Sequence, residues 1–183
     1  MKFMNLLRKG LAVLALSIGF TMGSNAVAGD FMMGPYRGGP KKNVEYLIIT
    51  PAVDRPEMLA LLIQSYSRQP VISVPTKTDG QILYYRPNKK TVAKINEADY
   101  AKFIAFLNPA KVLVFRGNNL IPGKYLRSIP PQVCTFELTC NDWFKNALQL
   151  EDMLRISGLY KNYVKLVNEK ERNRIYVPAG QQQ

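Results

Sequence analysis

Residues 44–74 have the sequence VEYLIITPAVDRPEMLALLIQSYSRQPVISV, and this stretch decides the fold class. The run Leu47-Ile48-Ile49 is continuous rather than alternating, which is typical of a strand buried on both faces. A turn follows in which Asp54 can cap a helix, and apolar residues at helical spacing predict that helix near residues 57–68. A second apolar stretch lies at residues 70–74. The unit is β-α-β, and its crossover predicts parallel pairing of the two strands.

The remainder of the chain continues this alternation of strands and helices. Further strands are expected at residues 81–86, 111–115, 133–138 and 175–177, helices at 97–107, 122–128, 142–156 and 159–169, and a basic loop at 87–94. The sequence therefore predicts a single α/β domain with a largely parallel sheet and flanking helices. This is a flavodoxin-like or Rossmann-like three-layer arrangement with a helical C-terminal part.

The first 28 residues have the three-part pattern of a secretory signal peptide. Basic residues precede an apolar run at residues 11–23, and the small residues Ala26 and Ala28 predict cleavage after Ala28. The apolar run is shorter than the roughly 20 residues that span a bilayer comfortably. We therefore expect an exported protein, in the periplasm or at the cell surface, with no membrane span after cleavage. An uncleaved membrane anchor is the alternative.

Residues 29–43 are rich in Gly and Pro and lack periodicity, so we expect a flexible N-terminal arm. The α/β domain should then occupy residues 44–178, followed by a tail at residues 179–183. Four large apolar side chains leave a second interpretation of the arm open, namely that it docks on a partner: Phe31, Met32, Met33 and Tyr36.

The chain is basic and lacks histidine entirely. Its 25 Lys and Arg outnumber 13 Asp and Glu, giving a formal net charge of +12. In an exported protein such a charge favours an anionic polymer or an acidic protein face as partner, and nucleic acid is not expected. It can also serve solubility alone. Without histidine, Ser-His-Asp and Cys-His nucleophiles and most zinc sites are excluded, whereas paired carboxylates and Ser-Lys arrangements stay open. We expect no catalytic residues, metal or cofactor.

The two cysteines, Cys134 and Cys140, are six residues apart in VCTFELTC. In an oxidising compartment this spacing favours a disulfide that closes a short loop. Two buried free thiols, or a redox pair with unusual spacing, are the alternatives.

The turn after the strand at residues 111–115 is the main candidate for a binding site. In open α/β sheets, ligands lie at the carboxyl ends of the strands. The guanidinium of Arg116 and the backbone amides of Gly117, Asn118 and Asn119 could form a nest for an anion there. A Gly-Asn turn that uses its own hydrogen bonds is the structural alternative.

Two carboxylates, Asp54 and Asp79, follow the first two strands and should lie near the same edge. Together they could serve acid–base hydrolysis of a glycan or hold a divalent cation. Each also has a structural alternative, because Asp54 can cap a helix and Asp79 stands in an Asp-Gly turn.

The order of parts resembles the cell wall-binding repeat 2 family over residues 44–130. In that family a strand and a helix opened by Asp lead to a second strand, and a later V-x-V-x-G-G turn leads to a further helix. Asp54 matches the helix-opening Asp, Arg116-Gly117 stands where the paired glycines stand, and Ile121 matches the following apolar residue. Arg116 departs from the family pattern, and the chain has one unit where the family usually has several. The resemblance implies a flavodoxin-like module that binds anionic wall polymer without catalysis.

Three functions follow from these observations. The first is an exported, non-catalytic envelope protein that binds an anionic polymer or a partner subunit of a secretion, pilus or surface assembly. The second is an exported glycan- or phosphoester-acting hydrolase that uses Asp54 and Asp79. The third is a periplasmic binder of small anions.

Overall fold

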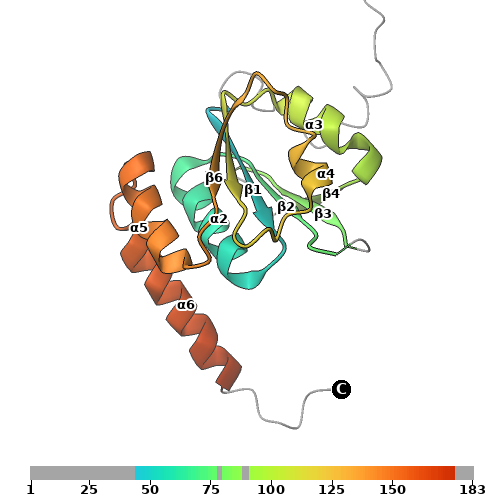
Figure 1. Cartoon of the computed structure of the whole chain (residues 1–183). Coiled ribbons are helices and arrows are strands. Elements are labelled where there is room, and N and C mark those ends of the chain that lie inside the picture. Colours follow the sequence, from blue (N-terminus) through green and yellow to red (C-terminus); the bar gives the residue numbers. More distant parts are fainter. Residues whose placement is uncertain (1–43, 78–79, 88–90, 176–183) are drawn as a thin grey trace, which may run out of the picture.

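The protein forms a three-layer α/β/α domain with a six-stranded sheet in the middle (Figure 1). The computed structural model describes residues 44–77, 80–87 and 91–175. The strand order is β4-β3-β2-β1-β5-β6, and most neighbouring strands are parallel. The predicted fold class is therefore confirmed. The predicted signal peptide, N-terminal arm and tail lie outside the described residues.

The β-α-β unit forms the centre of the sheet. Strand β1 (Tyr46–Pro51) is buried along its whole length and lies between β2 (Val71–Val74) and β5 (Lys111–Phe115), parallel to both. Helix α2 (Asp54–Ser67) makes the crossover from β1 to β2. Successive β1 side chains point to opposite faces of the sheet, and helices cover both faces, which explains the unbroken apolar run.

An antiparallel meander completes one side of the sheet. Strand β3 (Ile82–Tyr85) pairs antiparallel with β2, and β4 (Val92–Ile95) pairs antiparallel with β3. The predicted C-terminal end of the basic loop at residues 87–94 is wrong, because β4 already begins at Val92. This strand lies at the edge of the sheet and buries only Ile95, so its sequence VAKI carries no clear hydrophobic pattern.

The chain then returns across the sheet to its other side. The short 3-10 helix η1 (Glu97–Asp99) leads into α3 (Tyr100–Leu107), which brings the chain back to β5 beside β1. Helix α4 (Gly123–Leu126) leads to the edge strand β6 (Cys134–Leu138), which pairs parallel with β5.

Two helical layers enclose the sheet. Helices α3 and α4 cover one face, and α2 covers the other together with α5 (Trp143–Leu154) and α6 (Leu159–Ile175) (Figure 1). Each face has its own buried apolar cluster, so the core is divided into two halves by the sheet. In β5, Val114 faces α3 and α4, whereas Leu113 and Phe115 face the other helices.

Helix α6 is longer than its sequence predicts. The prediction ended it at residue 169 and placed a strand at 175–177, but the helix continues to Ile175 and the rest of that strand lies outside the described residues. Contacts with the start of α2 extend along it: the Tyr163 hydroxyl donates to the Arg55 carbonyl over 3.1 Å, and Lys170 pairs with Asp54 at 2.9 Å. These contacts give the polar final turns a surface to lie against.

Candidate functional site

The loops after β1 and β5 leave the sheet in opposite directions. The first leads to α2 on one face, and the second leads to α4 on the other. Because β1 and β5 are neighbours, the point between their carboxyl ends is a topological switch point, where α/β proteins commonly bind ligands. The predicted anion turn, residues 116–119, stands at this point.

The amides of this turn already have acceptors within the protein. The Gly117 amide donates to the Leu138 carbonyl over 2.9 Å, and the Asn119 amide donates to the Gly117 carbonyl over 2.8 Å. The Asn118 amide donates to the side-chain oxygen of Asn141 over 2.7 Å. Only the Asn119 amide bonds within the turn, whereas the other two bond to residues 138 and 141. The three amides could receive an anion only after exchanging these partners.

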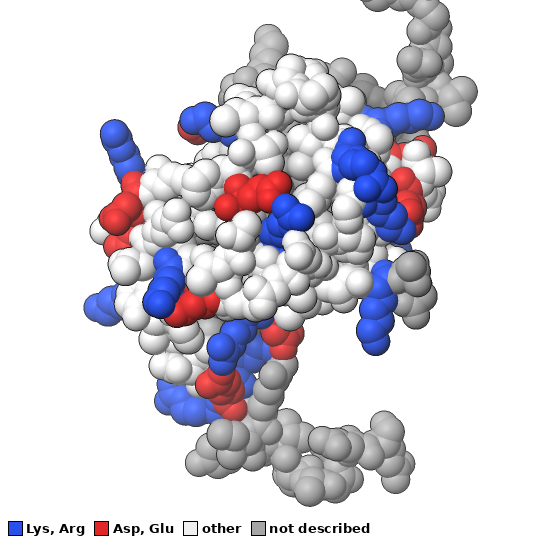
Figure 2. Space-filling model, viewed as in Figure 1, with Lys and Arg blue, Asp and Glu red and all other residues white. Residues whose placement is uncertain are grey.

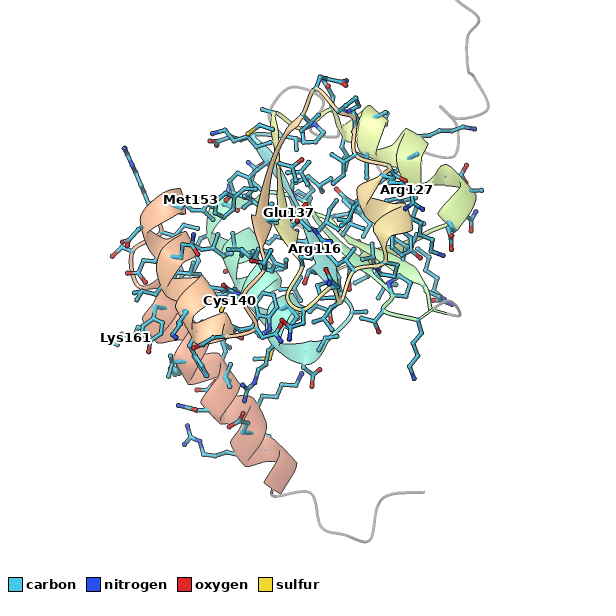
Figure 3. The ribbon with its side chains drawn as sticks, in the orientation of Figure 1. Arg116, Arg127, Glu137, Cys140, Met153 and Lys161 are labelled. Carbon is cyan, nitrogen blue, oxygen red and sulfur yellow. The ribbon has the colours of Figure 1, made fainter. Side chains whose placement is uncertain are left out.

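Arg116 is paired rather than isolated. Its guanidinium lies 2.8 Å from the Glu137 carboxylate on β6, and the two side chains are 36% and 35% exposed. Glu137 lies on β6 and Arg116 directly follows the neighbouring strand β5, and Figure 3 labels the two side chains close together near the middle of the view. The Nε atom of Arg116 is buried and has no acceptor among the described residues. An anion that binds here would have to compete with the Glu137 carboxylate for the positive charge of the Arg116 guanidinium.

Of the two candidate carboxylates, the structure describes only Asp54. Asp54 is the first residue of α2 and forms an ion pair with Lys170 from α6. Asp79 lies outside the described residues. Within the described ranges, no group of three or more Cys, Asp or Glu residues is arranged to hold a metal ion.

Cys134 and Cys140 are both free and exposed in this structure, and the disulfide between them stays a prediction. Cys134 begins β6, and Cys140 lies two residues beyond its end. A strand advances about 3.3 Å per residue, so Cys134 and the last residue of β6, Leu138, are about 13 Å apart. Pairing with β5 keeps residues 134–138 extended.

An open groove lies at the opposite edge of the sheet, by the amino ends of β1, β5 and β6. Its volume is about 790 Å³, and it is bounded by the last turns of α2 and α5. The floor and walls are mostly apolar, with charged and polar groups at the rim. The lining residues are Glu45, Tyr46, Tyr66, Ser67, Gln69, Lys111, Leu113, Cys134, Phe136, Met153, Leu154, Arg155 and Ile156.

Two large side chains in this groove are exposed although the sequence places them on apolar helix faces. Tyr66 of α2 is 45% exposed and Met153 of α5 is 40% exposed. Tyr46, on the floor, is buried, and this burial raises the pKa of its hydroxyl. The apolar stripe of each helix thus continues past the part that the sheet covers. That continuation to the last turn is the one sequence signal that could have indicated the groove.

Charges of both signs are mixed on the surface. Figure 2 shows that the face carrying β6 is largely uncharged, with acidic and basic side chains side by side near its middle and toward its edges. Several basic residues are paired in this way, including Arg55 with Glu171 and Lys124 with Glu97. The net positive charge therefore does not gather into one basic patch on this face.

The comparisons with known proteins give no assignment. No family model matches the chain, so the resemblance to the cell wall-binding repeats depends on the quoted residues alone. No curated protein and no solved structure matches it either. Across residues 44–77, 80–87 and 91–175, none of the helices combines the length and the apolar character that crossing a membrane requires.

Proposed function

We propose that this chain is an exported, non-catalytic envelope protein that binds a partner subunit of an envelope assembly. The groove at the amino edge of the sheet carries this proposal. It offers exposed apolar side chains, Tyr66 and Met153, above a buried floor, and a polar rim surrounds them. Protein interfaces commonly combine an apolar centre enriched in Tyr and Met with such a rim.

An anionic wall polymer is the second candidate partner. The formal charge of +12 favours it, as does the resemblance to the cell wall-binding repeats. The mixed charges on the face that carries β6 support it less, because a polymer site there would favour a continuous row of unpaired cations.

The other two functions draw less support from the site geometry. A small-anion binder would use Arg116 and the amides of residues 117–119, which are paired within the protein. A hydrolase would use Asp54, which lies beside the Lys170 ammonium. An Asp54→Asn variant that keeps full activity on wall and polysaccharide substrates would exclude a hydrolase mechanism that uses Asp54.

A photo-reactive amino acid at position 153 tests the proposed partner directly. Irradiation of intact envelopes should give a covalent adduct with a second protein, which mass spectrometry identifies. The same amino acid at Lys102, an exposed position on α3 at the opposite face, is the matched control and should give none.

Three other results would count against the proposal. Adducts of equal yield from both positions would indicate non-specific contact, and recovery of uncrosslinked monomer alone would leave the groove without a partner. Adducts with carbohydrate instead of protein would support the wall polymer.

A further inference from the structure

The N-terminal side of the described chain begins at the groove itself. The Val44 carbonyl accepts from the Ala110 amide over 3.1 Å, and the Glu45 amide donates to the Gln69 side chain over 3.1 Å. These bonds hold the start of β1 between β5 and the end of α2. Glu45 and Gln69 both line the groove. Consecutive Cα atoms are about 3.8 Å apart, so residue 43 lies within roughly 8 Å of a lining residue.

The segment before this point has side chains suited to an apolar groove. Residues 29–43 contain Phe31, Met32, Met33 and Tyr36 among glycines, prolines and basic residues. Phe31 to Tyr36 lie 8–13 residues before Val44, and an extended chain of eight residues reaches about 26 Å. Methionine side chains are flexible and polarisable, so they fill irregular apolar surfaces well.

We infer that residues 29–43 fold back onto the groove of their own chain, with Phe31, Met32 and Met33 packed against Met153 and Tyr66. A short connection keeps the segment at a high effective concentration near the groove, in the millimolar range. Docking within one chain is therefore favoured over docking between two chains at ordinary protein concentrations. A partner that uses the groove must first displace this segment.

The two cysteines provide an internal measurement of docking. Cys134 lines the groove, whereas Cys140 lies beyond the other end of β6 and is not among the lining residues. Both are exposed in the described structure. A docked segment should slow alkylation of Cys134 and leave Cys140 unaffected.

The experiment compares alkylation rates in the reduced protein that begins at Gly29. Mass spectrometry follows each cysteine separately in this chain and in a triple variant, Phe31→Ser, Met32→Ser and Met33→Ser. If the segment is docked nine-tenths of the time, Cys134 should react about tenfold more slowly in the parent chain than in the variant. Cys140 should react at the same rate in both, which also shows that the variant is folded.

A matched control replaces charges instead of apolar groups. The variant Arg37→Ser, Lys41→Ser and Lys42→Ser should keep Cys134 as protected as it is in the parent chain. Protection should also be the same from about 1 to about 100 μM protein, because docking within one chain does not depend on concentration.

Several results would overturn the inference. Equal Cys134 rates in the parent chain and the apolar variant would show that the segment does not cover the groove. Loss of protection in the charge variant would assign the effect to charge rather than to apolar packing. Protection that grows with protein concentration would assign the groove to the segment of a second copy. The rates are measured without any partner, so failure of the proposed function leaves this test unaffected.

Discussion

At Gly117 the backbone adopts a left-handed conformation, with φ of 50°, in the turn after β5. A Cβ atom there would lie 2.9 Å from the Asn141 side-chain oxygen and 3.2 Å from the Leu120 side chain. The Asn141 oxygen also accepts the amide of Asn118. The glycine therefore allows Asn141 to close the turn, and its role is structural.

Gly117→Ala should destabilise the protein by about 2 kcal/mol. A left-handed alanine costs about 1 kcal/mol, and displacement of Asn141 weakens a hydrogen bond worth about 1 kcal/mol. Gly158 is the matched control, because its φ is 77° but its nearest neighbour would be 3.7 Å from a Cβ atom. Gly158→Ala should cost only about 1 kcal/mol in urea unfolding. Equal losses at both positions would show that Asn141 does not matter.

Glu137→Gln tests the candidate anion site at the same turn. In the parent protein the carboxylate neutralises Arg116, so phosphate should leave the melting temperature unchanged. In the variant the neighbour of the Arg116 guanidinium is neutral, so the guanidinium can bind phosphate. Phosphate should then raise the melting temperature. Arg116→Gln in addition should abolish that increase. Equal stabilisation of the parent protein would show instead that an anion displaces Glu137 readily.

At the scale of elements, the start of α5 shows how a cap selects a boundary. The helix predicted at residues 142–156 would begin at Asp142, which makes Asn141 the residue before its first turn. In the structure the Asp142 carboxylate accepts from the amides of Phe144 and Lys145 over 3.1 and 3.2 Å. Asp142 is therefore the cap, the helix begins at Trp143, and Asn141 serves the turn after β5.

Asp142→Ala should cost about 1 kcal/mol of stability, because two amides at the start of α5 lose their acceptor. Asp142→Asn retains a side-chain oxygen at the same place and should cost a few tenths of a kcal/mol. Thermal or urea unfolding measures both. If Asn were as harmful as Ala, the charge of Asp142 rather than its capping bond would be responsible.

Local patterns predicted the elements that are buried and regular. The continuous run Leu47-Ile48-Ile49 predicted a strand covered on both faces, and helical spacing predicted α2, α3 and α5. Strand β4 was missed because its side chains are mostly exposed. The end of α6 was missed because Lys170 and Glu171 gain their partners only from α2, more than 100 residues earlier in the chain.

The hydrogen bonding of the candidate site was harder to predict than the helices and strands, because it depends on residues that are distant in the sequence. The rule for carboxyl ends of parallel strands placed the turn at residues 116–119 correctly. Whether its amides are free depends on Leu138, the last residue of β6, and on Asn141, three residues further along the chain. The groove arises where α2 and α5 extend beyond the sheet. The apolar stripes that continue to their last turns hint at it, but they do not state how far each helix extends past the strands.

For the molecule as a whole, buried tyrosines should make stability sensitive to high pH. Burial raises the pKa of Tyr163 from its ordinary value of 10.0 to about 12, with Arg55 lowering it and Asp142 raising it. The neutral hydroxyl is favoured in the folded state, so its stabilising contribution is present below pH 10 and is lost as pH rises toward 12.

Tyr163→Phe should therefore reduce the loss of stability between pH 10 and pH 12. At pH 7 the same variant should be less stable by about 1 kcal/mol, because the hydrogen bond to the Arg55 carbonyl is missing. Tyr160→Phe, at an exposed tyrosine on the same helix, is the control and should change neither value. Urea unfolding across this pH range measures both effects, and an unchanged pH dependence in Tyr163→Phe would contradict the assignment.

The central position of β1 has a consequence for how the chain acquires its structure in time. This strand is made first, yet it pairs with β5, which is synthesised about 65 residues later. At about 5–20 residues per second, the run Leu47-Ile48-Ile49 waits roughly 3–13 s for its second neighbour. During that interval an aggregation-prone segment is without the strand that later protects it. Binding of a chaperone to this stretch of the nascent chain would be the expected safeguard.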